Sequence, residues 1–173
     1  MKKSKTLLFG NTKCVINPLV LNNQPLEFVS QWKYLGTTIV AGKNVTFSSQ
    51  SELSTFYRSF NSLFSSHQKP NELVYMKLLY ANCVPNLTYN AEVKDSSSIS
   101  SRELQDLNTA LNNAIRRIFS YHKWESTRQL RQQLHFPNVI EIFRSRRSKF
   151  LKKCVELDND VVRFVITYFD IIL

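Results

Sequence analysis

The chain of 173 residues is long enough for one domain with a hydrophobic core, or for one domain with a small appendage. Its hydrophobic fraction of 43% is typical of a globular protein rather than a disordered one, and three glycines with five prolines favour long helices over a β-sandwich or barrel. A net charge of +10 and a pI near 9.7 favour a polyanionic partner.

The first 45 residues contain short runs of strand-forming residues separated by turn signals. These runs predict antiparallel strands at Thr6–Phe9, Cys14–Ile16, Val20–Leu21, Leu26–Val29 and Trp32–Ile39. In the last run, Gly36 would weaken a strand unless another backbone approaches closely. So few short strands form a marginal sheet alone, which indicates the edge of a larger sheet or a hairpin packed on helices.

Residues 46–157 show helical spacing. Ser49 and Glu52 fit a capping box, and the apolar residues from Leu53 to Phe64 recur at i, i+3, i+4 and i+7. The segment Glu72–Val84 is apolar nearly all round, which predicts a buried helix that Pro85 ends or kinks.

Further helices are predicted after a serine-rich loop at 95–101. Ser101 is expected to cap a helix with an apolar stripe from Leu104 to Phe119, followed by helices at Ser126–His135 and Val139–Leu157. In the last helix, one arc is apolar (Phe143, Phe150, Leu151, Cys154) and the opposite arc is basic (Arg146, Lys149, Lys152, Lys153). The predicted fold class is therefore α+β, mostly α: short antiparallel strands (1–45), a helical bundle (46–157) and an unassigned apolar tail (158–173).

The positive charge is concentrated in one block. The stretch from Arg116 to Lys153 contains seven arginines and four lysines but only two glutamates, which gives a net charge of +9. The block also contains Tyr121 and Trp124, and cations mixed with aromatic rings contact phosphates and stack on bases. The alternative is a solvated helix face whose Arg and Lys stems cover apolar neighbours. Trp124 itself is expected to be a core anchor.

Several kinds of site are not indicated by the sequence. No pair of carboxylates is convincing, because Asp158-Asn159-Asp160 follows a helix, where Asp and Asn commonly form turns. No glycine-rich phosphate loop or nucleophile elbow occurs. Cys14, Cys83 and Cys154 are too far apart for a zinc site, which favours reduced thiols in an intracellular protein. The apolar stretch 161–173 is too short and too charged to span a bilayer.

Five short segments with distinctive residue combinations follow one another along the chain. Lys-Ser-Lys-Thr-Leu-Leu-Phe occupies 3–9, Trp-Lys-Tyr-Leu-Gly occupies 32–36, and Val-Pro-Asn-Leu-Thr-Tyr-Asn-Ala-Glu occupies 84–92. Residues 108–119 with Trp-Glu-Ser at 124–126, and then Arg-Ser-Arg-Arg-Ser-Lys-Phe-Leu at 144–151, complete the series. This series resembles the C-terminal part of the reverse transcriptases of non-LTR (LINE-type) retrotransposons, although Asn90 stands where that family usually has glycine.

The resemblance implies a palm edge with a primer grip, followed by a helical thumb. In the intact family enzyme this region holds the RNA and DNA of the template–primer while the palm performs nucleotidyl transfer with Mg²⁺. The grip would be Lys33, Tyr34, Leu35 and Gly36. The residues implied to contact phosphates are Arg116, Arg117, Lys123, Arg128, Arg131, Arg146, Lys149, Lys152 and Lys153. Because the strand pair that bears the catalytic aspartates has no counterpart in the sequence, we expect no polymerase activity and no cofactor for this chain alone.

Three other hypotheses stay open at this point. The first is that the chain is a stand-alone basic helical module that binds nucleic acid. The second is that it is an interaction protein that docks through the apolar segment Glu72–Val84. The third is a non-functional pseudogene product whose exposed apolar surface invites aggregation. The sequence favours an intracellular protein of the nucleus or cytoplasm that is not secreted, identifies no protein partner, and does not distinguish RNA from DNA.

Overall fold

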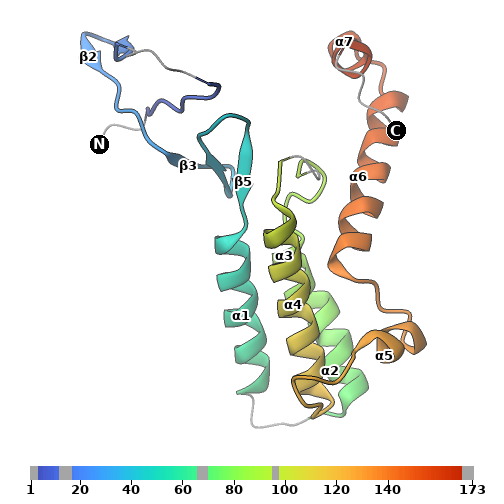
Figure 1. The fold of residues 1–173 in the computed structure, drawn as a ribbon. Coiled ribbons are helices and arrows are strands. Elements are labelled where there is room, and N and C mark those ends of the chain that lie inside the picture. Colours follow the sequence, from blue (N-terminus) through green and yellow to red (C-terminus); the bar gives the residue numbers. More distant parts are fainter. Residues whose placement is uncertain (1–3, 12–16, 66–69, 95–97, 169–173) are drawn as a thin grey trace.

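The chain folds as an α+β protein that is mostly helical, as the sequence predicts. A computed structural model describes residues 4–11, 17–65, 70–94 and 98–168. Short strands come first along the chain and helices follow (Figure 1). The strand predicted at Cys14–Ile16 lies outside the described residues.

The strands form two separate antiparallel units. Two of them make a hairpin, β1 (Val20–Leu21) and β2 (Gln24–Pro25). The other three make a sheet in chain order, β3 (Gln31–Tyr34), β4 (Thr37–Val40) and β5 (Thr46–Ser48). The single strand predicted over Trp32–Ile39 is wrong, because the chain reverses at Leu35 and Gly36 between β3 and β4. The strand β5 is not indicated by the sequence pattern.

Two other predicted strands are reduced to single bridges. Thr6 pairs with Phe28, and Phe9 pairs with Gly42, each as an isolated parallel bridge. The predicted strands Thr6–Phe9 and Leu26–Val29 are therefore wrong as continuous antiparallel elements. Their residues favour extended backbone, but extended backbone becomes a strand only where a neighbour offers a continuous ladder.

The helices begin after β5. In chain order they are α1 (Gln50–Phe64), α2 (Glu72–Leu78), the π-helical turn η1 (Leu79–Cys83), α3 (Val84–Leu87), α4 (Ser101–Ile118), α5 (Arg128–Gln133), α6 (Val139–Glu156) and α7 (Asp160–Tyr168). The helix α7 occupies much of the tail that the sequence left unassigned.

Capping differs in detail from the prediction. Helix α4 is capped by Ser100 rather than Ser101, in a capping box with Glu103. The box predicted from Ser49 and Glu52 is wrong, because the Ser49 side chain makes no cap hydrogen bond and Glu52 is buried against Lys94. A glutamate at the third helical position satisfies the capping pattern, but here a buried cation binds its carboxylate instead.

The predicted helix Glu72–Val84 is interrupted by η1. The backbone N–H of Val84 donates to the carbonyl of Leu79, five residues earlier. Pro85 has no N–H to donate, and one wide turn before it accommodates the loss without ending the helix. The prediction that this segment is buried all round is wrong for Leu73, Val74 and Tyr80, which are exposed.

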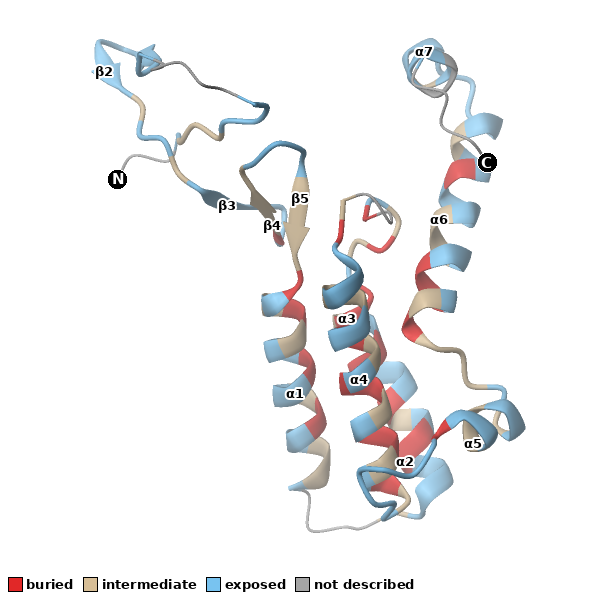
Figure 2. Cartoon of the chain, in the orientation of Figure 1, coloured by how far each residue is buried: buried red, intermediate tan, exposed pale blue. Residues whose placement is uncertain are grey.

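The core lies between the helices. Figure 2 shows the buried residues on the facing sides of α1, α3 and α4, and along one side of α6. Its largest fully buried side chains include Phe56, Leu79, Leu107, Ile115 and Val139. Helix α6 packs against α4, and this packing connects the basic block to the rest of the bundle.

Candidate nucleic-acid interface

The predicted primer-grip segment is the tip of a hairpin rather than the middle of a strand. Tyr34 and Thr37 form the last pair of β3 and β4, and the turn residues Leu35 and Gly36 have φ angles of 46° and 81°. Positive φ at both central positions is the geometry of a type I′ turn, whose twist matches that of a two-stranded hairpin. Leu35, a bulky residue in this conformation, is therefore held there by something outside the turn.

Tyr89 supplies that restraint from the end of the α3 segment. Its hydroxyl donates a hydrogen bond of 3.0 Å to the carbonyl oxygen of Leu35. The ring lies so close to Gly36 that a Cβ at this position would be 2.9 Å from both Tyr89 Cε1 and Oη. Gly36 is thus needed twice, for its backbone conformation and for the approach of the ring. The close approach that the sequence suggests at this glycine comes from a side chain rather than from a backbone.

Asn90 adds a second link between the hairpin and the same turn. Its φ is 54°, a left-handed conformation that Asn tolerates better than most residues, and its Nδ2 donates to the hydroxyl of Thr37. Thr37 is buried. The position where the resembling family has glycine therefore does have a backbone that suits glycine, and the asparagine side chain binds the hairpin in addition.

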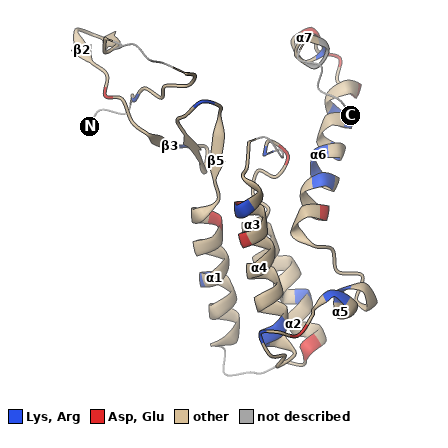
Figure 3. Cartoon of the chain, in the orientation of Figure 1, with Lys and Arg blue, Asp and Glu red and all other residues tan. Residues whose placement is uncertain are grey.

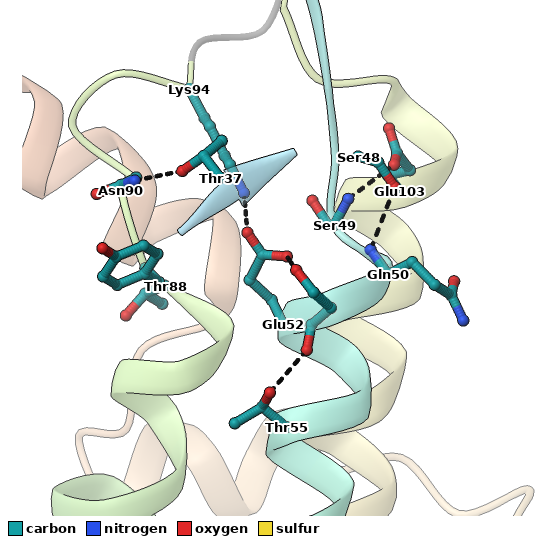
Figure 4. Close-up of polar contacts among 12 residues, drawn as sticks. Thr37, Ser48, Ser49, Gln50, Glu52, Thr55, Thr88, Asn90, Lys94 and Glu103 are labelled. Atoms are coloured by element: carbon teal, nitrogen blue, oxygen red, sulfur yellow. Dashed lines mark hydrogen bonds and ion pairs between the residues drawn. The ribbon is translucent and has the colours of Figure 1, made fainter. Parts of the chain in front are cut away.

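A buried ion pair lies beneath this junction (Figure 4). Lys94 contacts the carboxylate of Glu52, and their side chains are only 1% and 4% exposed. The hydroxyl of Ser51 donates to the same carboxylate over 2.7 Å. One residue before α1, the backbone N–H of Ser49 donates over 3.0 Å to Glu103 on α4. These contacts fix the start of α1, and hence the strand β5 before it, relative to α4 and the turn after α3.

Helix α6 reaches the same turn through two arginines. Arg146 donates a 3.0 Å hydrogen bond to the carbonyl of Thr88 and lies 3.9 Å from the carboxylate of Glu92. Arg147 donates over 3.4 Å to the carbonyl of Glu92. The prediction that Arg146 lies on the arc opposite the apolar residues is therefore wrong. It lies on the side of α6 that faces the bundle, where it donates to one carbonyl oxygen and lies near one carboxylate. Phe150, predicted to belong to the apolar arc, is exposed.

Arg116 and Arg117 also bind the protein itself. Arg116 Nε donates over 2.9 Å to the carbonyl of Glu125. Arg117 donates over 2.8 Å to Asn61 on α1, and its guanidinium lies 4.7 Å from the centroid of the Phe64 ring. Part of the donor set of each guanidinium is therefore already used in contacts within the protein. Their implied contact with phosphates stays a prediction.

The cations of the basic block lie along α6 and around the connection between α4 and α5 (Figure 3). Lys149, Lys152 and Lys153 are exposed on α6, and Lys123 and Arg128 are exposed near α5. Lys33 is exposed at the hairpin, close to Tyr34 and Leu35. The described part of the chain offers none of the four lysines Lys123, Lys149, Lys152 and Lys153 a hydrogen-bond or ion-pair partner. Their ammonium groups are available to phosphates.

Arg131 and Arg128, two of the predicted phosphate contacts, line the same cavity. The cavity has a volume of about 650 Å³ and is also lined by Gln132 and His135. Within the described residues, Nε and Nη1 of Arg131 are buried and have no hydrogen-bond partner. Burial lowers the pKa of the Arg131 guanidinium, and the carboxylate of Glu141 in the same wall partly offsets this.

Trp124 lies elsewhere than predicted. It is not a core anchor, because it is 73% exposed in the connection between α4 and α5. It stacks on His122, with ring centroids 4.7 Å apart and ring planes 3° apart. The sequence interpretation expected Trp124 in the core and gave His122 no particular role. The mixture of cations and aromatic rings at 121–124 was the signal that pointed to an exposed surface able to stack on bases.

Within residues 4–11, 17–65, 70–94 and 98–168, no three His, Cys, Asp or Glu side chains come together as a metal site. No helix in these ranges is long and apolar enough to cross a bilayer. No protein-family model, no curated protein and no solved structure matches the chain.

Proposed function

We propose that the chain is the primer-grip and thumb region of an RNA-directed DNA polymerase of the non-LTR retrotransposon type. In this proposal it acts inside the cell, in the nucleus or cytoplasm, and holds an RNA template paired with a DNA primer. It performs no nucleotidyl transfer itself, because that reaction needs converging carboxylates on metal ions. The hairpin tip at Lys33–Gly36 contacts the primer, and the exposed cations of α6 and the α4–α5 connection contact phosphates.

The observation that supports this proposal is that three of the five segments that resemble family motifs meet in the structure. Residues 32–36, 84–92 and 144–151 are far apart in the sequence. They join through the hydrogen bonds of Tyr89 to Leu35, of Asn90 to Thr37 and of Arg146 to Thr88. A device that holds a primer end must fix its grip relative to the surface that holds the duplex. The hydrogen bonds of this junction connect the hairpin to α6 in the way that such a device needs.

Binding to a defined template–primer tests the proposal. A labelled DNA primer annealed to a longer RNA template is titrated with the chain, and fluorescence anisotropy is followed at several KCl concentrations. Replacing Lys149, Lys152 and Lys153 together by Gln removes up to three phosphate contacts. The slope of log K against log salt should then become less steep by about 2 to 3 units.

A matched variant separates a local contact from the general effect of charge. Lys43, Arg58 and Lys77 are also exposed cations, but they lie outside the basic block. Replacing these three by Gln changes the net charge equally and should leave the slope within about 1 unit of the unsubstituted chain. Equal losses in the two triple variants would refute a dedicated surface on α6.

A second measurement separates the polymerase proposal from a stand-alone basic module. A grip at the hairpin predicts tighter binding to a recessed primer 3′ end than to a blunt duplex of equal length. Tyr34→Ala and Lys33→Gln should reduce this preference while blunt-duplex binding stays the same. No preference for the recessed end would favour the stand-alone module, and no binding to any nucleic acid would favour a protein-interaction role. Primer extension by the chain with dNTPs and Mg²⁺ would contradict the proposal that it lacks polymerase activity.

A further inference from the structure

The connection between α4 and α5 displays a stacked aromatic pair to solvent. Trp124 is 73% exposed, although tryptophan is usually among the most buried side chains on average. His122 covers one face of the indole, with the two ring planes only 3° apart. The exposed area of Trp124 therefore lies on its other face and its edges, and the core gains nothing from it.

The backbone around this pair is held in place before any ligand binds. The N–H of Tyr121 donates over 2.8 Å to the carbonyl of Arg116, and the N–H of Glu125 donates over 3.1 Å to that of His122. The carboxylate of Glu125 accepts from the N–H of His122, and Arg116 Nε donates over 2.9 Å to the Glu125 carbonyl. The turn that carries both rings is thus tied to the end of α4, which lowers the ordering cost of binding.

The surroundings of the pair decide which ligand suits it. Lys123 lies between the two aromatic residues in sequence, and Arg128 follows shortly after; both are exposed. An apolar protein partner would bury these charges without compensation. A cationic ligand would be repelled by them. A nucleotide offers a planar ring for the indole and a phosphate for the cations, and it satisfies both features.

We propose that the His122–Trp124 stack binds an unpaired nucleobase in a single-stranded segment of nucleic acid, with Lys123 contacting an adjacent phosphate. A base within a duplex is stacked on both faces and cannot offer one to the indole, so the ligand is an overhang or another unpaired stretch. This inference rests on the proposed function, and it adds a single-strand site to a surface that otherwise contacts only phosphates.

Tryptophan fluorescence tests this directly, because the chain contains only two tryptophans, Trp32 and Trp124. Trp32→Phe leaves Trp124 as the sole reporter. This variant is titrated with a template–primer that carries a single-stranded template overhang, and with a blunt duplex of the same paired length. The overhang should quench the emission of Trp124 and the blunt duplex should not. Equal quenching by both ligands would overturn the proposal.

Affinity gives a second readout. Trp124→Ala should weaken binding to the overhang ligand by about 5- to 150-fold, the range for one stacked base, while leaving blunt-duplex binding unchanged. Trp124→Phe should retain most of the overhang affinity. Because Trp124 is exposed, the variants should melt as the unsubstituted chain does, and circular dichroism confirms this.

Helix α7 offers a matched control. Phe164 is 62% exposed and stacks on Tyr168, with centroids 5.3 Å apart, but its neighbours include Asp158 and Asp160. Phe164→Ala removes an exposed stacked ring from an acidic setting and should not change overhang binding. If the unsubstituted chain binds neither ligand, the proposed function fails. If it binds both, and Trp124→Ala matches Phe164→Ala on the overhang, only the stacking proposal fails.

Discussion

Replacing Gly36 by Ala should destabilise the hairpin tip by about 2–3 kcal/mol. The φ of 81° places any L-residue in the left-handed region, which costs about 1–2 kcal/mol. The added Cβ would be 2.9 Å from Tyr89 Cε1 and Oη. The ring can move toward solvent because Tyr89 is exposed, but it then loses its hydrogen bond to the Leu35 carbonyl, worth about 1 kcal/mol. The two contributions together give the expected range.

Hydrogen exchange measures this local opening. Amides in residues 31–40 should exchange about 30- to 150-fold faster in Gly36→Ala, since each 1.4 kcal/mol is a factor of ten in the opening equilibrium. Tyr89→Ala removes both the ring and its hydrogen bond, so Gly36→Ala in that background should cost only the backbone contribution of about 1–2 kcal/mol.

The other glycines of the chain supply the controls. Gly42 has no positive φ and its nearest atom to a built Cβ is 3.9 Å away, so Gly42→Ala should change exchange in the hairpin by less than about threefold. Gly10 has a φ of 106° with no atom within 4 Å, so Gly10→Ala isolates the backbone contribution at another turn. If Gly36→Ala exchanged like Gly42→Ala, the reasoning that Gly36 is required by conformation and by the Tyr89 ring would be refuted.

Three further predictions concern the helical part. Lys94→Met should lower the free energy of unfolding by about 3–5 kcal/mol, because Glu52 stays buried with its charge uncompensated. In urea denaturation, the double variant Lys94→Met with Glu52→Leu should recover most of this loss. If the losses of the two single variants were additive in the double variant, the prediction would be contradicted. Burial raises the pKa of the Cys83 thiol to about 11, so its contribution to stability is complete below about pH 9 and is lost as the pH rises toward 11. This alkaline loss should disappear in Cys83→Ala, and iodoacetamide at pH 8 should label the half-buried Cys154 well before Cys83. Asn138→Ala removes the 2.8 Å bond from the Glu141 N–H and should cost about 1 kcal/mol by thermal melting, with no loss expected from the exposed Ser148→Ala on the same helix.

Helical periodicity predicts much of this fold because the signal is local. The apolar positions of α1 and α4 recur with the helical period, and most of the side chains that the period selects are buried or half-buried. Pro85 likewise marks a disturbance that is decided by its own missing N–H. In each case the information lies within a few residues of the structure that it determines.

The hairpin and Trp124 could not be predicted in this way. The turn at Leu35–Gly36 depends on Tyr89, 54 residues later, and leucine rarely adopts a positive φ, so strand propensity alone favours one continuous strand. The large apolar ring of Trp124 predicts a buried position. The turn that carries it is instead held at the end of α4 by the hydrogen bond from Arg116 to Glu125, which leaves Trp124 exposed to solvent. Tertiary contacts override local preference at both places.

Arginine and lysine have different parts in the basic block, and this difference explains why charge alone could not locate the site. Arg116, Arg117 and Arg146 each donate to protein oxygens that lie on another segment of the chain. The rigid, planar guanidinium can bridge two fixed acceptors, whereas an ammonium on a flexible stem is better suited to solvent and to mobile phosphates. The arginines therefore order the surface on which the lysines of α6 and Lys123 are displayed. A basic stretch in a sequence combines both functions, and only the positions of the acceptors separate the cations that hold the fold from those that remain for a ligand.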